Sequence, residues 1–247
     1  MLTLRVCCSR LLAELRAASL IGAVLLSLSC RSDEGVARAA SEAEAKRSRL
    51  TAFNDRMSKL RGGVESVPRE ERPCSESAIE RRLRGRESKL LLVDQAYLGR
   101  FADPGLDPYG GEAARWKFLT GPALRAIPLF QQPPADPALT DAVFKTVKLD
   151  ETYVYAAVLR GDRREPPRLE GERFHAGILE GWLVLAELKG GPALCATRVS
   201  ARSSEEVAGR GGQTPNDVLW RDFVRQVRNE LDQAAQRLSS RFQVDLE

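Results

Sequence analysis

The sequence predicts an α+β fold, in which an antiparallel β-meander is covered by a long carboxy-terminal helix and preceded by shorter helices. Apolar residues gather in three short segments between residues 153 and 199, joined by short links, which is typical of strands. From about residue 215 to 240 they return every three or four positions, which is typical of one helix face. Across 247 residues, 43% hydrophobic and 29% charged residues exclude a polytopic membrane protein and a wholly disordered chain.

The first predicted helix covers about residues 42–61. Ser41 and Glu44 have the spacing of a capping box, and Gly62-Gly63 follows the last apolar residue. Its apolar stripe either packs on the domain or forms a stalk or a surface for a partner helix. The stripe consists of Leu50, Phe53, Met57 and Leu60. We expect a loop rich in glycine, proline and charge from 62 to 73.

Shorter elements follow up to residue 137. A second helix is predicted from Ser77 to near Gly85, with Glu80 completing another capping box. The apolar run 90–93 is too short to distinguish a strand from a helix. Residues 103–111 predict turns, and 112–130 predict a partly helical segment interrupted at Gly121-Pro122. The three prolines in 131–137 indicate a connector.

The predicted meander begins with a strand at 153–159 that is apolar on both faces, as in a central strand. A charged loop at 160–171 and a strand at 182–188 come next. Residues 189–192 have the composition of a hairpin turn, and the return strand covers 193–199. Gly177 and Gly181, near the start of the second strand, indicate a bulge.

After a glycine-containing loop at 203–213, the last helix has the clearest signals. Thr214 is placed to cap it, Pro215 suits the first helical position, and Asp217 lies in the first turn. The apolar face is expected to dock on the meander and contains Trp220, Phe223, Val227 and Leu231. The opposite face is expected to meet water and contains Arg221, Asp222, Arg225, Arg228, Asn229 and Asp232.

The amino terminus has the pattern of an export signal. Residues 1–16 include three arginines, residues 17–28 carry no charge, and Ser29 and Cys30 follow. An apolar segment this short suits a signal peptide better than a spanning helix, which needs about 20 residues. The pattern resembles the lipobox of bacterial lipoproteins. This resemblance implies cleavage after residue 29, lipidation of Cys30 and attachment to a membrane through the acyl chains.

An ordinary secretory signal and an uncleaved amphipathic anchor are the alternatives. On the lipoprotein interpretation the chain divides into a signal peptide at 1–29, a small polar tether at 30–40, an amphipathic helix and loop at 41–73, and a globular α+β domain at 74–247.

Cleavage would leave three of the five cysteines: Cys30, Cys74 and Cys195. With lipid on Cys30, export to an oxidising compartment would allow a disulfide between the other two. Two separate buried thiols are the alternative. A metal site is not expected, because two cysteines and one histidine do not complete a tetrahedral shell.

The sequence contains no motif of a known catalytic class, and we expect neither a catalytic residue nor a cofactor. His175, the only histidine, could act as a base oriented by Asp162 or Glu180, but a surface or half-buried imidazole is the expectation. Five acids could supply an acid–base pair, although each more simply solvates a turn or helix end: Asp94, Asp103, Asp107, Asp150 and Glu151.

Two basic clusters indicate either solvated faces or contact with anionic headgroups or polysaccharide. The first contains Arg81, Arg82, Arg84 and Arg86, and the second contains Arg160, Arg163, Arg164 and Arg168. The tripeptide Arg160-Gly161-Asp162 matches a cell-adhesion motif that recurs by chance. Trp182, Tyr153 and Tyr155 either line a ligand pocket or belong to the core of the sheet.

The predicted function is that of a lipid-anchored, non-enzymatic envelope protein that binds or scaffolds a protein or polysaccharide partner in the periplasm or at the cell surface. The net charge of +4 falls to about +2 without the first 29 residues, which gives no reason to expect nucleic acid. The alternatives are a carrier of a small apolar ligand and an enzyme of unrecognised class. Convergent acids in a cleft would favour the enzyme, and an apolar cavity the carrier. An exposed apolar patch on a filled core would favour partner binding.

Overall fold

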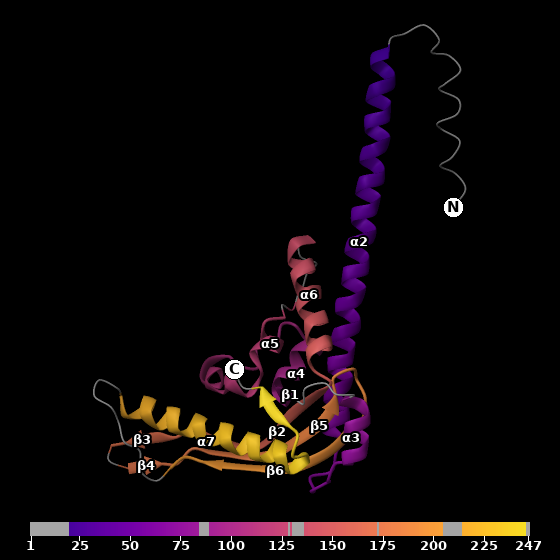
Figure 1. The fold of residues 1–247 in the computed structure, drawn as a ribbon. Coiled ribbons are helices and arrows are strands. Elements are labelled where there is room, and N and C mark those ends of the chain that lie inside the picture. Colours follow the sequence, from indigo (N-terminus) through magenta and orange to yellow (C-terminus); the bar gives the residue numbers. More distant parts are fainter. Residues whose placement is uncertain are drawn as a thin grey trace. The chain divides into compact units, whose positions relative to one another are not determined.

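The computed structural model describes residues 20–83, 89–127, 129, 136–171, 173–204 and 214–245 (Figure 1). It divides the chain into two compact units, Met1–Arg47 and Ser48–Glu247. The larger unit is an α+β domain, which confirms the predicted fold class. No helix in the described part of the chain combines the length and the apolar character that a membrane crossing requires.

Helix α2, Leu20–Glu65, is longer than predicted at both ends. It includes residues 30–40, which were predicted as a tether and are helical. Alanine, arginine and glutamate in this segment are strong helix formers, whereas the prediction gave more weight to its small and polar character. Gly62 and Gly63 do not end the helix, because each costs only about 1 kcal/mol and Val64 is fully buried just beyond them.

The short elements that follow agree well with their predictions. Helix α3, Glu76–Leu83, begins one residue earlier than expected. The ambiguous apolar run is strand β1, Lys89–Asp94. Helix α4, Gln95–Ala102, precedes the predicted turns, and the partly helical segment forms a 3₁₀ helix, Gly111–Leu119, and helix α5, Pro122–Arg125.

Helix α6, Asp136–Thr152, was not predicted from the sequence. Residues 131–135 of the predicted connector lie outside the described residues, and the helix begins directly after them. The signal was present, because Leu139, Ala142, Thr146 and Leu149 are buried at helical spacing. Leu139 and Ala142 pack with Leu50 of α2.

The main sheet has the strand order β6–β5–β2–β1–β7. Its antiparallel part is the predicted meander and consists of β2, Tyr155–Glu165, β5, Ile178–Glu187, and β6, Ala193–Arg202. Strand β1 extends the meander in parallel with β2, and β7, Gln243–Asp245, is parallel to β1. The sheet is therefore mixed, and the prediction of a purely antiparallel meander is wrong for its β1–β7 edge. Three-residue β7 is too short to be recognised by periodicity.

The predicted loop at 160–171 is also wrong, because β2 continues to Glu165 and a small hairpin follows. The hairpin pairs β3, Arg168–Glu170, with β4, Arg173–His175. A register shift between Gly161 and Arg163 marks a bulge in β2 opposite Gly181. A Cβ atom at Gly181 would lie 2.2 Å from the carbonyl oxygen of Arg160, so a side chain there would collide with backbone. Gly177 and Gly181 predicted a bulge in the second strand of the meander, whereas this bulge lies in the neighbouring strand β2.

Helix α7, Pro215–Leu238, forms as predicted. The side chain of Thr214 accepts a hydrogen bond from the backbone N–H of Asp217. The helix packs on β6 and its neighbours, and Phe223, Val227 and Leu231 are fully buried. Trp220 is partly buried against the same core.

Asp222 corrects the prediction that the opposite face of α7 meets only water, because it is 5% exposed. Its carboxylate accepts hydrogen bonds from the backbone N–H and the hydroxyl of Ser204, at 2.8 and 3.1 Å, and pairs with Arg225. Burial raises the pKa of Asp222, but the bonds from Ser204 and Arg225 outweigh it and hold the pKa below its ordinary value. Asp222 thus connects the segment just after β6 to α7.

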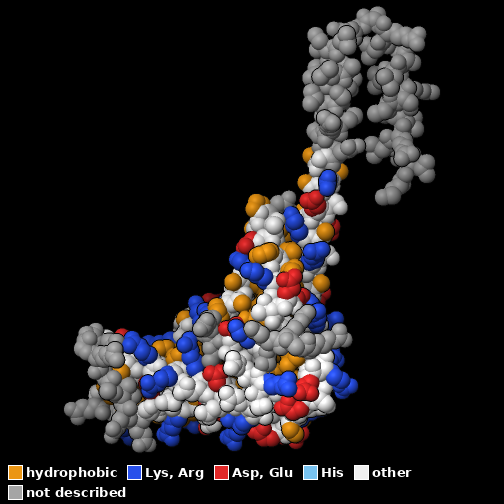
Figure 2. Space-filling view, viewed as in Figure 1, with side chains coloured by type: hydrophobic (Ala, Val, Ile, Leu, Met, Phe, Trp, Pro, Cys, Tyr) orange, Lys and Arg blue, Asp and Glu red, His pale blue; other side chains and the backbone are white. Residues whose placement is uncertain are grey.

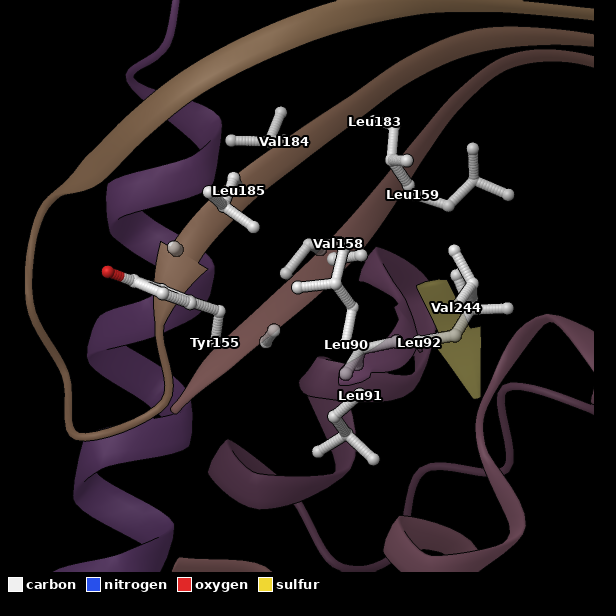
Figure 3. Packing of buried hydrophobic residues seen from close by; sticks show 14 of the residues in the cluster. Leu90, Leu91, Leu92, Tyr155, Val158, Leu159, Leu183, Val184, Leu185 and Val244 are labelled. Atoms are coloured by element: carbon white, nitrogen blue, oxygen red, sulfur yellow. The ribbon is translucent and has the colours of Figure 1, made fainter. Parts of the chain in front are cut away.

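The central strands form the middle of the core (Figure 3). Leucines and valines from β1, β2, β5 and β7 contact one another there, and those of β1 are fully buried. A second part of the core is aromatic. Trp116 of the 3₁₀ helix lies edge-on to Trp220 and Phe223 of α7, with ring centroids 5.6 and 5.8 Å apart.

Candidate functional site

The structure brings Cys74 and Cys195 together at disulfide distance, with Cα atoms 5.0 Å apart. The two cysteines predicted to pair are therefore close enough to form a disulfide. Cys74 lies just before α3, and Cys195 is a buried residue of β6. Next to the pair, the backbones of Arg72 and Ala196 exchange two hydrogen bonds of 3.0 Å. The segment that leads into α3 is therefore fixed to the sheet at two adjacent points.

The predicted lipid site is Cys30. Cys30 lies within α2, but its side chain is outside the described part of the structure. Residues 1–19 of the predicted signal peptide are also outside it. Lipidation and export therefore stay predictions.

A charged groove of about 640 Å³ lies where α3, the end of α6 and the β5–β6 turn meet. This volume is within the range of small-molecule sites, about 300–1,000 Å³. The groove combines cations and carboxylates, and its polar walls are formed by Arg81, Arg82, Asp150, Tyr153, Glu187 and Lys189. Two members of the first basic cluster thus belong to it, while Arg84 and Arg86 lie outside the described residues.

Ion pairs involve only some of the charged side chains in and beside this groove. Arg82 binds Glu187 at 3.0 Å, and Arg56 of α2 binds Asp150 at 2.8 Å. Three buried polar atoms close to these pairs have no hydrogen-bond partner among the described residues: Arg56 Nε, Asp150 Oδ1 and the Tyr155 hydroxyl. Buried polar groups are normally bonded, so three together are unusual.

A second polar cluster surrounds Asp94 at the carboxyl end of β1. Asp94 is fully buried, and its two oxygens accept hydrogen bonds of 2.6 and 2.7 Å from Arg164 of β2. It also caps α4 by accepting from the backbone N–H of Ala96 at 3.0 Å. The Tyr109 hydroxyl lies 3.4 Å from the carboxylate and 2.6 Å from the Thr120 hydroxyl. Both carboxylate oxygens of Asp94 are therefore bonded, and the side chain connects β1, β2 and α4.

Gly161 makes the contact between Asp94 and Arg164 possible. A Cβ atom at Gly161 would lie 2.4 Å from Arg164 Nε. The guanidinium crosses this open position and also lies 6.0 Å from the ring centroid of Trp116. Burial lowers the pKa of Arg164, but its bonds with Asp94 outweigh burial and hold the pKa above its ordinary value. A neighbouring cavity of about 490 Å³ includes Arg61, Gln95 and exposed Leu106.

Replacing Asp94 by asparagine should lower the free energy of unfolding by about 2–3 kcal/mol, because the Arg164 guanidinium would lose its charged partner. Urea denaturation of the purified full chain measures this change. Asp162→Asn is the matched control, since its pair with Arg69 is 3.2 Å long and more exposed, and should cost less than about 1 kcal/mol. Equal effects of the two substitutions would contradict the anchoring role of Asp94.

The remaining candidate acids bond backbone groups or are exposed, and the histidine lies near a different acid from the two considered. Asp103 and Asp107 bond backbone N–H groups of their own turns, and Glu151 is exposed. His175 Nε2 lies 3.4 Å from Glu170, neither of the two acids considered from sequence. The described residues also contain no cluster of three or more histidine, cysteine or acidic side chains suited to a metal ion.

The second basic cluster bonds mainly within the domain. Arg160 donates to the carbonyl oxygens of Val64 and Val67 at the end of α2, at 3.3 and 2.7 Å. Arg163 and Arg168 pair with nearby glutamates. Of the aromatic residues considered as pocket walls, Tyr155 belongs to the core, Tyr153 lines the charged groove, and Trp182 is partly buried against the core.

Helix α6 carries the most exposed large apolar side chain among the described residues of the larger unit. Phe144 is 58% exposed and Val147 is 39% exposed, one turn apart. Lys148 Nζ lies 5.3 Å from the Phe144 ring centroid. Figure 2 shows hydrophobic side chains among charged ones over this part of the surface. This surface was not predicted from the sequence because helix α6 was not predicted.

Comparison with known proteins adds no family to this description: no family model, curated protein or solved structure matches the chain.

Proposed function

We propose that the protein is a lipid-anchored, non-enzymatic protein of the bacterial cell envelope that binds a partner protein in the periplasm or at the cell surface. The anchor rests on the resemblance of the residues up to Cys30 to a lipobox. The pairing of Cys74 with Cys195 supports the oxidising location, because disulfides persist in exported proteins and are rare in the cytosol.

The observation on which the binding role rests is the exposed apolar surface of α6. Phe144 and Val147 face solvent, whereas the inner residues of the same helix pack on α2 and the core. Exposed apolar side chains one helical turn apart form an i, i+3 pair of the kind used in helix recognition. The two cavities described above contain several charged side chains, which supports an apolar-ligand carrier less well. The bonding of Asp94 to Arg164 leaves that acid unsuited to general acid–base chemistry.

Site-specific crosslinking in the native cell tests the binding role. A photoreactive residue at position 147 should form a discrete adduct with an envelope protein, and the same residue at exposed position 173 on β4 should not. Phe144→Ser should reduce the adduct without changing the amount of protein, because this side chain is 58% exposed and adds little to stability. The absence of an adduct at position 147, or equal adducts at both positions, would contradict the proposal.

Lipidation has its own prediction. Cells that express the full chain in the presence of a labelled fatty acid should incorporate label into the protein, and Cys30→Ser should abolish it, because the thiol is the acceptor in lipoproteins. Cys195→Ser is the control and should keep the label. Equal labelling of the original chain and Cys30→Ser would refute Cys30 as the lipid site.

A further inference from the structure

Strand β6 forms one edge of the main sheet, and other parts of the chain cover its outward-facing backbone groups. An uncovered edge strand can pair with another chain, so native proteins protect such edges. Residues 68–73, which we call the strap, cover the part of the edge next to Cys195. Each of these residues is exposed on its own outer side and bonds or lies beside the strand.

The strap covers the edge through backbone and carboxylate hydrogen bonds. Arg72 and Ala196 form an antiparallel bridge with two backbone hydrogen bonds of 3.0 Å. The Glu71 carboxylate accepts a hydrogen bond from the backbone N–H of Arg198 at 2.9 Å. The strap therefore binds the outward groups of Ala196 and the outward N–H of Arg198.

Helix α7 covers the next outward groups of the same edge. Arg237 donates to the carbonyl oxygen of Arg198 at 2.6 Å, and Glu230 accepts from the N–H of Ser200 at 3.3 Å. This part of the cover is fixed, because α7 packs on β6 through its buried face. The edge thus has one cover that belongs to a packed helix and one that belongs to the strap.

The cysteine pair holds the strap in place. Burial of apolar surface does not hold it, because its residues are exposed, and the nearest buried residues on either side are Val67 and Ile79. Cys74 directly follows the strap, and its partner Cys195 is next to Ala196. A disulfide here keeps the bridge partners together, whereas without it the bridge must also offset the entropy of ordering the strap.

We infer that the Cys74–Cys195 disulfide is a redox-controlled lock on the strap, closed in the oxidised chain and opened by a dithiol reductant. The inference rests on the predicted disulfide and is independent of the apolar surface of α6. Cys195 is 1% exposed and Cys74 is partly exposed, so the first thiolate of the dithiol attacks the sulfur of Cys74.

The exchange is balanced in atoms and electrons. The S–S bond breaks as the dithiol forms a mixed disulfide with Cys74, and Cys195 leaves as a thiolate that takes a proton. The second thiol of the reductant then attacks its own mixed disulfide and releases Cys74. The dithiol is oxidised to a disulfide, and its electron pair and both protons pass to the two cysteines.

Site-resolved hydrogen exchange of the detergent-purified, exported chain, with and without dithiothreitol, tests the lock. The N–H groups of Ala196 and Arg198 face the strap, whereas those of Thr197 and Val199 face β5, because the direction alternates along an antiparallel strand. Reduction should raise the exchange rate of the outward pair relative to the inward pair by at least about tenfold. A general loss of stability would raise both rates and would not produce this change in their ratio.

Ser200 is the internal control, because its outward N–H is covered by α7 and should show no such rise. Cys74→Ser is the matched variant: it should have the raised ratio without reductant and should not respond to dithiothreitol. Its inward N–H groups report whether it folds. An unchanged ratio on reduction, an equal rise at Ser200, or a Cys74→Ser variant that exchanges as the oxidised chain does would each overturn the lock. Free thiols at Cys74 and Cys195 in the folded, exported protein would also overturn it.

Discussion

Replacing Phe223 by alanine should lower the free energy of unfolding by about 3–5 kcal/mol, the usual cost of truncating a buried aromatic residue. Phe223 is fully buried on the inner face of α7, and its ring contacts those of Trp116 and Trp220, with centroids 5.8 and 5.7 Å away. Its ring also packs on Gly177: a Cβ atom there would lie 2.8 Å from it. Alanine would therefore leave a cavity where α7, the 3₁₀ helix and the start of β5 now pack together.

Chemical denaturation of the purified full chain measures this loss. Arg228→Ala is the control on the exposed face of the same helix, and it should change stability by no more than about 0.5 kcal/mol. An unchanged transition midpoint for Phe223→Ala, together with loss of the crosslinked partner, would show that the stripe is a recognition surface and that α7 does not stabilise the domain.

Loss of the Cys74–Cys195 bridge is the second large expected effect. The two cysteines are 121 residues apart in sequence, and closing so long a loop should contribute up to about 4–5 kcal/mol by restricting the unfolded chain. Exported Cys195→Ser should therefore unfold at lower denaturant concentration than the original chain. Lipid labelling at Cys30 should not change.

A reducing agent provides the matched comparison. It should lower the stability of the original chain towards that of Cys195→Ser and leave the variant unaffected. Mass mapping of exported protein without reduction should detect the peptides of Cys74 and Cys195 linked together. Two free thiols in folded, exported protein would refute the bridge.

The elements that could be predicted are those whose signals are local. Thr214 and Pro215 define the start of α7, and the apolar spacing from Phe223 to Leu231 defines its buried face. The meander was predictable from three apolar segments joined by short links. The pairing of Cys74 with Cys195 was predictable because the lipoprotein interpretation leaves no other pair.

What sequence could not predict depends on contacts between distant residues. Arg164 belongs to a charged segment that resembles a loop, but pairing with β5 makes the segment a strand, and Asp94, 70 residues earlier, binds the Arg164 side chain. Helical spacing puts Asp222 on the exposed face of α7, but its contact with Ser204, which is distant in sequence, buries it. The charged groove combines Arg81, Asp150 and Lys189 from three elements, one of which was missed. Short β7 is defined only by its pairing with β1.

The central claim is that this domain is exported and attached to a membrane through Cys30. Mass spectrometry of the amino-terminal peptide of the protein purified from native membranes tests it most directly. The lipoprotein interpretation predicts a chain that begins at Cys30, with a diacylglycerol on the thiol and, where the organism performs the last step, an acyl group on the new amino terminus. A chain that begins at Met1, or one cleaved elsewhere without lipid on Cys30, would contradict it.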